Sequence, residues 1–213
     1  MGEILLVRHG QANSHATTEE DYDRLSDLGH EQARLLGQWM RDHDYAFDHV
    51  LSGTLRRHRE TVEGMGYAAE EDARLNEIDY YGLSASLQDR KGEPLPSHDT
   101  FSDHMPKVFA AWARAEIEGN ETYEAFEARI ETLLAEAAVP GRRLLCVTSG
   151  GVIGMVLRQL LDLDLMRLSR VILPIWNTSL HRLHVRGGET NLAGYNAIPH
   201  LEAPALAQSR THV

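Results

Sequence analysis

Apolar and polar residues alternate along this chain with two different periods. Short apolar runs predict buried strands, and longer stretches with apolar residues three or four positions apart predict helices. Ser26 stands where it can cap the first of these helices. In chain order the pattern predicts a strand at 3–9, a helix at 27–43, a strand at 47–53, helices at about 55–65, 102–119 and 122–138, a strand at 143–149 and a buried helix at 150–161.

The remaining segments give weaker patterns. Residues 73–78 predict a short extended piece, and the stretch from Asp79 to Ser102, with Gly92, Pro94 and Pro96, predicts an exposed loop. Short strands are predicted at 169–176, 178–185 and 190–198. Strands that alternate with helices, without repeats or linkers, indicate one α/β domain over residues 1–213, a three-layer α/β/α sandwich with a mostly parallel central sheet.

Composition narrows the classes of function. The 213 residues are 42% hydrophobic and 25% charged, as in an ordinary globular protein, and the net charge of −11 argues against general binding to nucleic acid or anionic membranes. The single cysteine, Cys146, lies in an apolar run and is interpreted as a buried hydrophobic residue. Residues 1–7 are too short for a signal peptide and no apolar run reaches 18 residues, so we expect a soluble cytoplasmic protein.

Three predicted strands end in residues suited to an anion. Arg8, His9 and Gly10 follow the first strand, three arginines at 56, 57 and 59 follow the second, and Ser149 precedes two glycines at the start of a helix. Carboxyl ends of parallel strands share one edge of the sheet, where α/β proteins bind ligands. Guanidinium groups and helix N-termini direct donors to phosphate oxygens, and a neutral histidine beside them can attack phosphorus. Arginine would supply the charge that a metal supplies elsewhere.

These residues resemble the histidine phosphatase superfamily, which includes phosphoglycerate mutases. The strand-end motif stands here as Arg8-His9-Gly10-Gln11, and the stretch SGTLRRHRET matches the second motif, with Thr61 fixing the register. The resemblance covers nearly the whole chain, to the closing YNAIPHL. It implies a phosphoglycerate mutase-like fold, a phosphohistidine on His9, phosphate binding by Arg8 and Arg57, and a proton donor at Glu77 in LNEIDYYGL.

Two departures from the family pattern affect the expected site. The family usually has a second histidine in its fourth motif, where this chain has Ser149 followed by Gly150 and Gly151. We therefore expect a slower enzyme, whose turnover the substitution Ser149→His would raise, unless neighbouring side chains already fill that space. The family's asparagine is replaced by His15, with Asn13 close by. Gln11, Asn13, Ser149 and Gly150 are the residues expected to bind substrate.

Several residues in these motifs also have structural interpretations. Arg56 and Arg59 are expected on the solvated face of a helix, and Asp79 is the competitor of Glu77 as proton donor. Tyr80 and Tyr81 are more typical of packing groups than of ligand contacts.

Other classes of site find less support. The twelve histidines include close pairs in HDTFSDH and HRLH, but none has the HExxH spacing of a zinc site, so no metal or other cofactor is expected. GGVIG does not match the dinucleotide-binding pattern GxGxxG. Ser149 between a strand and a helix resembles the nucleophile elbow of esterases, but the first glycine of GxSxG is missing.

The sequence therefore favours a metal-independent phosphomonoester hydrolase that acts on a small phosphorylated substrate. Two alternatives stay open: a weakly active or inactive module that binds phosphorylated ligands, and a phosphoglycerate-type mutase. The segment from Asp79 to Ser102 and the helices after it are expected to select the substrate. Substrate identity and oligomeric state are left open.

Overall fold

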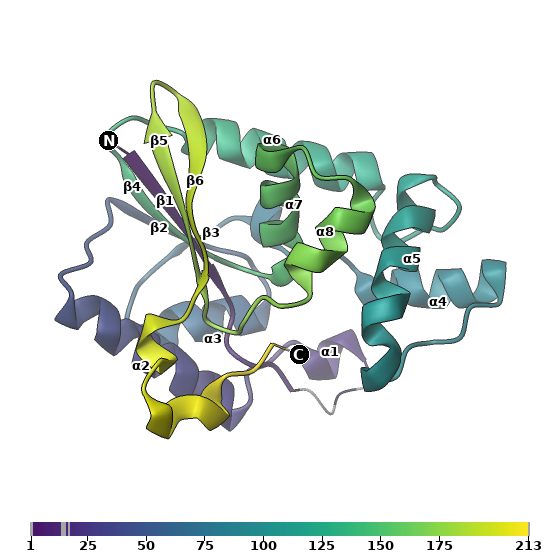
Figure 1. Cartoon of the computed structure of the whole chain (residues 1–213), viewed down its shortest axis with the longest axis horizontal. Coiled ribbons are helices and arrows are strands. Elements are labelled where there is room, and N and C mark those ends of the chain that lie inside the picture. Colours follow the sequence, from purple (N-terminus) through teal and green to yellow (C-terminus); the bar gives the residue numbers. More distant parts are fainter. Residues whose placement is uncertain (1, 14–15, 17, 213) are drawn as a thin grey trace.

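A six-stranded sheet forms the centre of the protein in the computed structural model, which describes residues 2–13, 16 and 18–212 (Figure 1). The strands lie in the order β3-β2-β4-β1-β5-β6. Those from β3 to β1 are parallel, and β5 and β6 are antiparallel additions at one edge. The strands are β1 (Gly2–Arg8), β2 (His49–Ser52), β3 (Glu70–Glu71), β4 (Arg143–Thr148), β5 (Leu180–Arg186) and β6 (Glu189–Ala197).

Helices cover both faces of this sheet, and α4 and α5 extend beyond it (Figure 1). The α-helices are α1 (Glu19–Tyr22), α2 (Asp27–Asp42), α3 (Arg56–Gly64), α4 (Tyr80–Lys91), α5 (Phe101–Ala113), α6 (Tyr123–Ala137), α7 (Gly150–Leu161) and α8 (Leu165–Ile172). Short 3-10 helices follow at η1 (Ala73–Leu75), η2 (His98–Thr100), η3 (Pro199–Leu201) and η4 (Pro204–Ser209). The prediction of an α/β fold with helices on both sides of a central sheet is confirmed.

The alternation of side chains along β1 explains why two layers of helices are needed. Leu5 and Val7 pack in one core cluster with residues of α2 and α3, whereas Ile4 and Leu6 pack in a second cluster with residues of α5, α6 and α7. Successive side chains of a strand point to opposite faces, so a strand that is apolar at every position must be covered twice. Cys146 of β4 is buried, as predicted, and burial raises the pKa of its thiol to about 12.

Ser26 caps α2 as predicted, because its side chain accepts a hydrogen bond from the amide of Gly29 at 3.1 Å. Three local predictions were wrong. The segment 73–78 contains the 3-10 helix η1 and no strand, residues 80–91 form α4 within the predicted loop, and residues 165–172 form α8 where a strand was predicted from 169. Each of these three helices begins behind an aspartate, Asp72, Asp79 or Asp164, whose side chain accepts a backbone amide.

The strand order places the ends of β1, β4 and β2 next to one another. Arg8 is paired with Thr148, and Ser52 is paired with Val147, so the residues that follow these strands emerge at one edge of the sheet. This edge is where the three sequence motifs meet. None of the helices in the described part of the chain is long and apolar enough to cross a membrane.

Candidate active site

Hydrogen bonds between the motifs hold the end of β1 in place. The amide of His9 donates to the carbonyl of Thr148 at 2.9 Å, and the amide of Gly10 donates to Thr61 Oγ1 at 3.0 Å. Thr61 Oγ1 in turn donates to the carbonyl of Arg57 at 2.6 Å. The first two motifs and the end of β4 are thus joined directly, although Thr61 and Thr148 lie about fifty and about 140 residues from His9 along the chain.

His9 has the geometry of a neutral nucleophile. Its side chain is 2 % exposed, and Nδ1 lies 2.7 Å from the carbonyl oxygen of Gly10. A carbonyl only accepts, so Nδ1 carries the proton and Nε2 keeps its lone pair. Burial first, and then the positive charges of Arg57 and Arg8, hold the pKa of His9 well below its usual value. The imidazole is therefore uncharged at neutral pH, with Nε2 available for attack.

Arg8 provides one partly buried positive charge beside this imidazole. Its Nη1 atom donates to the carbonyl oxygens of Ile175 and, at 2.7 Å, of His212. Burial lowers the pKa of Arg8, while interactions with Tyr22 and Glu77 raise it. An arginine stays protonated under such conditions because its ordinary pKa is so high. Backbone carbonyls therefore orient Arg8 without neutralising its charge.

Arg57 provides the second buried charge and is anchored by a residue from the loop before α2. Asp23 Oδ1 accepts hydrogen bonds from the Arg57 amide at 3.1 Å and from Arg57 Nη1 at 3.0 Å. Asp23 Oδ2 accepts from the amide of Arg56 at 2.9 Å, so this carboxylate also caps α3. The Arg57 guanidinium lies 5.0 Å from the centre of the Tyr22 ring. Sequence reasoning missed Asp23 and Tyr22, because neither lies in a motif.

Glu77 lies at the N-terminus of α7. Its Oε2 atom accepts from the Gly151 amide at 3.0 Å, and its Oε1 atom accepts from the Ile78 amide at 3.0 Å. A Cβ atom at position 151 would lie 2.2 Å from Oε1, so only glycine leaves room for this carboxylate. Glu77 is also close enough to Arg8 to affect its pKa. A carboxyl group fixed beside Arg8 is well placed for proton transfer.

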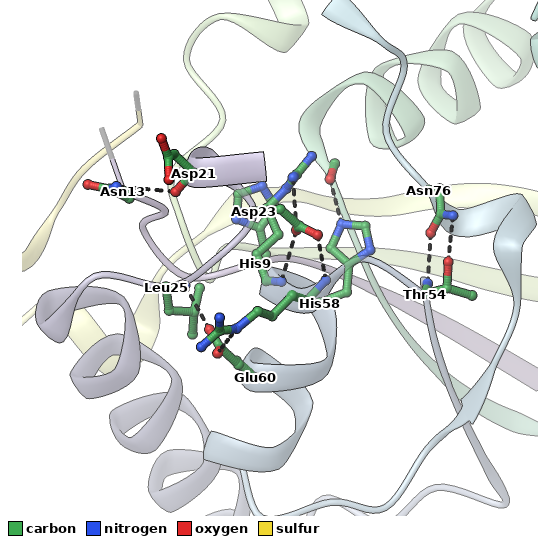
Figure 2. A network of polar contacts seen from close by, with 12 residues as sticks. His9, Asn13, Asp21, Asp23, Leu25, Thr54, His58, Glu60 and Asn76 are labelled. Carbon is green, nitrogen blue, oxygen red and sulfur yellow. Dashed lines mark hydrogen bonds and ion pairs between the residues drawn. The ribbon is translucent and has the colours of Figure 1, made fainter. Parts of the chain in front are cut away.

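Ser149 does not face open space. The expectation that Ser149→His would raise turnover assumed an open pocket at this position, and the structure contradicts that assumption. The Ser149 side chain is completely buried, and its Oγ atom lies 2.6 Å from Nε2 of His58. His58 is the residue of α3 that Figure 2 shows near His9. His58 is itself completely buried, and its ring centre is 5.6 Å from that of His9. Burial, followed by the charge of Arg57, holds the pKa of His58 well below its usual value. His58 was not predicted from the sequence to be a residue of the site.

The other residues expected to bind substrate have partners within the protein. Gln11 Oε1 accepts from Ser26 Oγ at 2.8 Å, and Asn13 Nδ2 donates to the carbonyl of Asp21 at 3.2 Å. Both contacts hold the loop that follows His9 in place. The geometry does not support direct ligand binding by either side chain. Gly150 begins α7, whose first amides have no acceptor within the helix. His15 lies outside the described residues.

Structural contacts are observed for the arginines and tyrosines that had structural interpretations, and also for Asp79, the predicted competitor of Glu77. Arg56 and Arg59 lie on the exposed side of α3 and pair with Glu60 and Glu71. Asp79 accepts the amide of Gly82 at 2.9 Å and thereby caps α4. Tyr80 packs against Phe101 and Tyr81 packs near Tyr22. In the part of the chain that the structure describes, no group of three or more His, Cys, Asp and Glu side chains could hold a metal ion.

A buried neutral imidazole near two guanidinium groups, at the carboxyl ends of parallel strands, is typical of α/β proteins that handle phosphoryl groups. This chain belongs to the histidine phosphatase superfamily (branch 1), whose family model matches residues 4–198. The match confirms the family that the strand-end motifs indicated.

Curated relatives of the chain include both phosphatases and mutases. It is 33% identical over 107 residues to a mitochondrial serine/threonine-protein phosphatase Pgam5 from Drosophila willistoni, covering 49% of this chain and 33% of the relative. It is 37% identical over 98 residues to a 2,3-bisphosphoglycerate-dependent phosphoglycerate mutase from Chelativorans, covering 41% of this chain and 48% of the relative. The matches thus span between a third and a half of these relatives' lengths.

Solved structures agree in fold over almost the whole chain. A mutant phosphoserine phosphatase from Entamoeba histolytica, in complex with phosphoserine, superposes with a TM-score of 0.70 at 16% identity, covering 94% of this chain and 100% of that one. A mycobacterial glucosyl-3-phosphoglycerate phosphatase superposes with a TM-score of 0.61 at 22% identity, covering 92% and 98%. At such low identities the likeness shows the fold alone.

Proposed function

We propose that the protein hydrolyses a phosphomonoester through a phosphohistidine formed on His9. The observation that carries this proposal is the hydrogen bond from His9 Nδ1 to the Gly10 carbonyl, because it leaves the Nε2 lone pair free beside Arg8 and Arg57. Membership of a superfamily with phosphatase and mutase relatives supports it. The substrate class is a small phosphorylated compound.

The reaction proceeds in two steps, and the proton that Glu77 gives in the first step is regained in the second. In the first, His9 Nε2 bonds to phosphorus, the bond from phosphorus to the leaving oxygen breaks, and Glu77 gives that oxygen a proton. In the second, water attacks phosphorus, the P–N bond breaks, and Glu77 takes a proton from the water. Inorganic phosphate then leaves, and both residues return to their starting states.

Arg8 and Arg57 neutralise the charge on the phosphoryl oxygens. Besides the covalent step on His9, positioning and charge stabilisation contribute strongly to phosphoryl transfer. Amides in the first turn of α7 add directed donors for the same anion. Because two fixed cations serve this purpose, turnover should persist in the presence of a chelator such as EDTA.

Two other functions remain alternatives to hydrolysis. A module that only binds phosphorylated ligands would keep the arginines but form no phosphoenzyme. A mutase would transfer the phosphoryl group to a phosphoglycerate instead of water. The curated relatives include both phosphatases and mutases, so they do not distinguish these two reactions. Release of inorganic phosphate from a range of phosphomonoesters, measured with and without 3-phosphoglycerate as acceptor, distinguishes the three.

The test of the proposal is turnover of an aryl phosphate by wild type and His9→Ala. Loss of at least about 10³-fold is expected in the variant, since no second nucleophile is proposed at the site. Arg59→Ala is a suitable control because Arg59 is an exposed cation of α3, and its removal should leave the rate nearly unchanged. Phosphatase activity retained by His9→Ala would contradict the mechanism.

A further inference from the structure

His58 is a buried imidazole at the site to which the proposed mechanism gives no task. It lies on α3 next to Arg57, has no exposed surface, and its ring stands 5.6 Å from that of His9 (Figure 2). Polar groups are buried at a cost unless hydrogen bonds compensate. The position of this ring therefore calls for an explanation in terms of its partners.

Ser149 is the hydrogen-bond partner of His58, and its own local structure makes that contact unusual. Ser149 occupies the N-cap position of α7 with an extended backbone, where a serine hydroxyl normally accepts an amide from the first turn. Here its side chain makes no such capping bond, and Glu77 accepts the Gly151 amide instead. The hydroxyl lies 2.6 Å from His58 Nε2. It is therefore available for a purpose other than capping.

The other ring nitrogen indicates the direction of this hydrogen bond. Nδ1 of His58 is buried and has no hydrogen-bond partner among the described residues. The backbone of Gly53 packs against it, since a Cβ atom there would lie 2.1 Å from Nδ1. Buried N–H groups without acceptors are rarer than unpaired acceptors, so the proton is assigned to Nε2. Nε2 then donates to Ser149 Oγ, and the hydroxyl hydrogen of Ser149 points elsewhere.

We propose that His58 and Ser149 act as a pair in which the imidazole positions and polarises the hydroxyl, so that Ser149 donates a hydrogen bond to the phosphoryl group on His9. Ser149 is the group that touches the substrate, and His58 is a positioning residue. Donors in a chain of hydrogen bonds strengthen one another, most of all in a buried site. The pair lies at the N-terminus of α7, where anions are already favoured. This inference rests on the proposed phosphatase function.

A double-mutant cycle tests the pair directly. We expect Ser149→Ala and His58→Ala each to lower kcat for an aryl phosphate about 10-fold to 100-fold, as loss of one hydrogen bond to a charged group does, with a smaller change in KM. The double variant should be no slower than the slower single variant, because either substitution removes the same interaction. Losses that multiply in the double variant would overturn the proposal.

A conservative variant separates positioning from structural support. Gln at position 58 keeps an amide donor of similar reach, so His58→Gln should recover most of the kcat lost in His58→Ala. In the Ser149→Ala background the same change should recover nothing. His200→Ala, which removes a buried imidazole bonded to Thr178, is the matched control and should lower the melting temperature without lowering kcat. Equal recovery in both backgrounds would overturn the proposal.

The outcome is distinguishable from failure of the proposed function. If wild type is inactive or His9→Ala stays active, the phosphatase mechanism itself fails. If wild type is active, His9→Ala is inactive and the His58 variants turn over like wild type, only the pair is refuted. A phosphoryl group found on Ser149 after acid quenching would likewise refute the pair, because it would make Ser149 the nucleophile and His58 its base.

Discussion

Single polar atoms at this site are fixed by backbone groups. The Gly10 carbonyl sets the tautomer of His9, the Ile175 and His212 carbonyls hold Arg8, and the Gly151 amide holds Glu77. Backbone partners lose little entropy when the site forms, so the groups are oriented before a substrate arrives. Each catalytic role can therefore be tested by changing one side chain.

Glu77 should matter in proportion to how much the leaving group needs a proton. We predict that Glu77→Gln slows hydrolysis of an alkyl phosphate by at least about 10²-fold and that of p-nitrophenyl phosphate by less than about 10-fold. Steady-state kcat/KM values for the two substrates check this. The control is Asp79→Asn, since Asp79 caps α4. Equal losses with both substrates in Glu77→Gln would assign the proton to another group.

Ser149→His should lower turnover, in contrast to the expectation from the sequence. The Ser149 side chain is completely buried and in contact with His58, so an imidazole there must displace its neighbours. Removing the imidazole at position 58 in a His58→Ala/Ser149→His double variant provides room, and we predict about 10-fold faster turnover than in Ser149→His alone. Thermal melts establish that both variants fold. Faster turnover than wild type in the single variant would show that position 149 has room for an imidazole.

At the scale of elements, one carboxylate joins the loop before α2 to the start of α3. Asp23 accepts the amides of Arg56 and Arg57 and the guanidinium of Arg57. Asp23→Ala removes a helix cap and the ion pair that Asp23 makes with the buried Arg57, so we predict about 2–4 kcal/mol lower stability and a KM at least about 10-fold higher. Chemical denaturation and steady-state kinetics give the two values.

Asp164→Ala is the matched control for this change. Asp164 caps α8 by accepting the Arg167 amide at 2.7 Å, outside the site. Its loss should cost about 1 kcal/mol of stability and leave KM unchanged. If Asp23→Ala behaves in the same way, Asp23 acts on α3 alone and does not hold Arg57 for phosphate.

The elements that could be predicted from the sequence are those whose pattern is strong and uninterrupted. β1, β2, β4 and β5 and the helices α2, α3, α6 and α7 lie close to their predicted positions. The helix α8 was mistaken for a strand because Val171 and Ile172 favour strands locally, whereas packing of Leu168 in the core and the cap at Asp164 favour a helix. The helix α4 has no clear apolar face, and flanking glycine and prolines concealed it.

The residues of the site also differ in whether they could be predicted from the sequence. Residues directly after strands, such as His9, could be placed from the motifs because parallel strands end at one edge of a sheet. Asp23, Tyr22 and His58 could not, since their contacts join segments distant in the chain and leave no local pattern. Thus the positions of His9 and the two arginines could be predicted, but the residues that orient them could not.

For the whole molecule, buried histidines make stability depend on pH. Burial lowers the pKa of His181 to about 3 and of His200 to about 4, and holds those of His9 and His58 well below the usual value. The unfolded chain takes up these protons below about pH 6.5 and the folded chain does not, so acid favours unfolding. The stabilisation that these neutral histidines contribute is fully present above about pH 6.5. It decreases as the pH falls from there toward the pKa values of the histidines in the folded protein.

We predict that the free energy of unfolding decreases by more than about 1.4 kcal/mol per pH unit between about pH 6 and 5, since one neutral buried histidine accounts for that slope. Urea denaturation at several pH values measures it. His181→Gln should be less stable at pH 8 but should have a shallower slope, because Gln does not titrate. An unchanged slope in that variant would contradict the contribution of His181.

The most direct test of the account is to locate the phosphoryl group during turnover. Wild type mixed with an aryl phosphate, quenched in alkali and digested, should give a peptide with one phosphoryl group on His9, and the label should disappear in acid because phosphohistidine is acid-labile. The variant His9→Ala should give no labelled peptide. A phosphoryl group on any other residue, or full turnover with no labelled His9, would contradict the account.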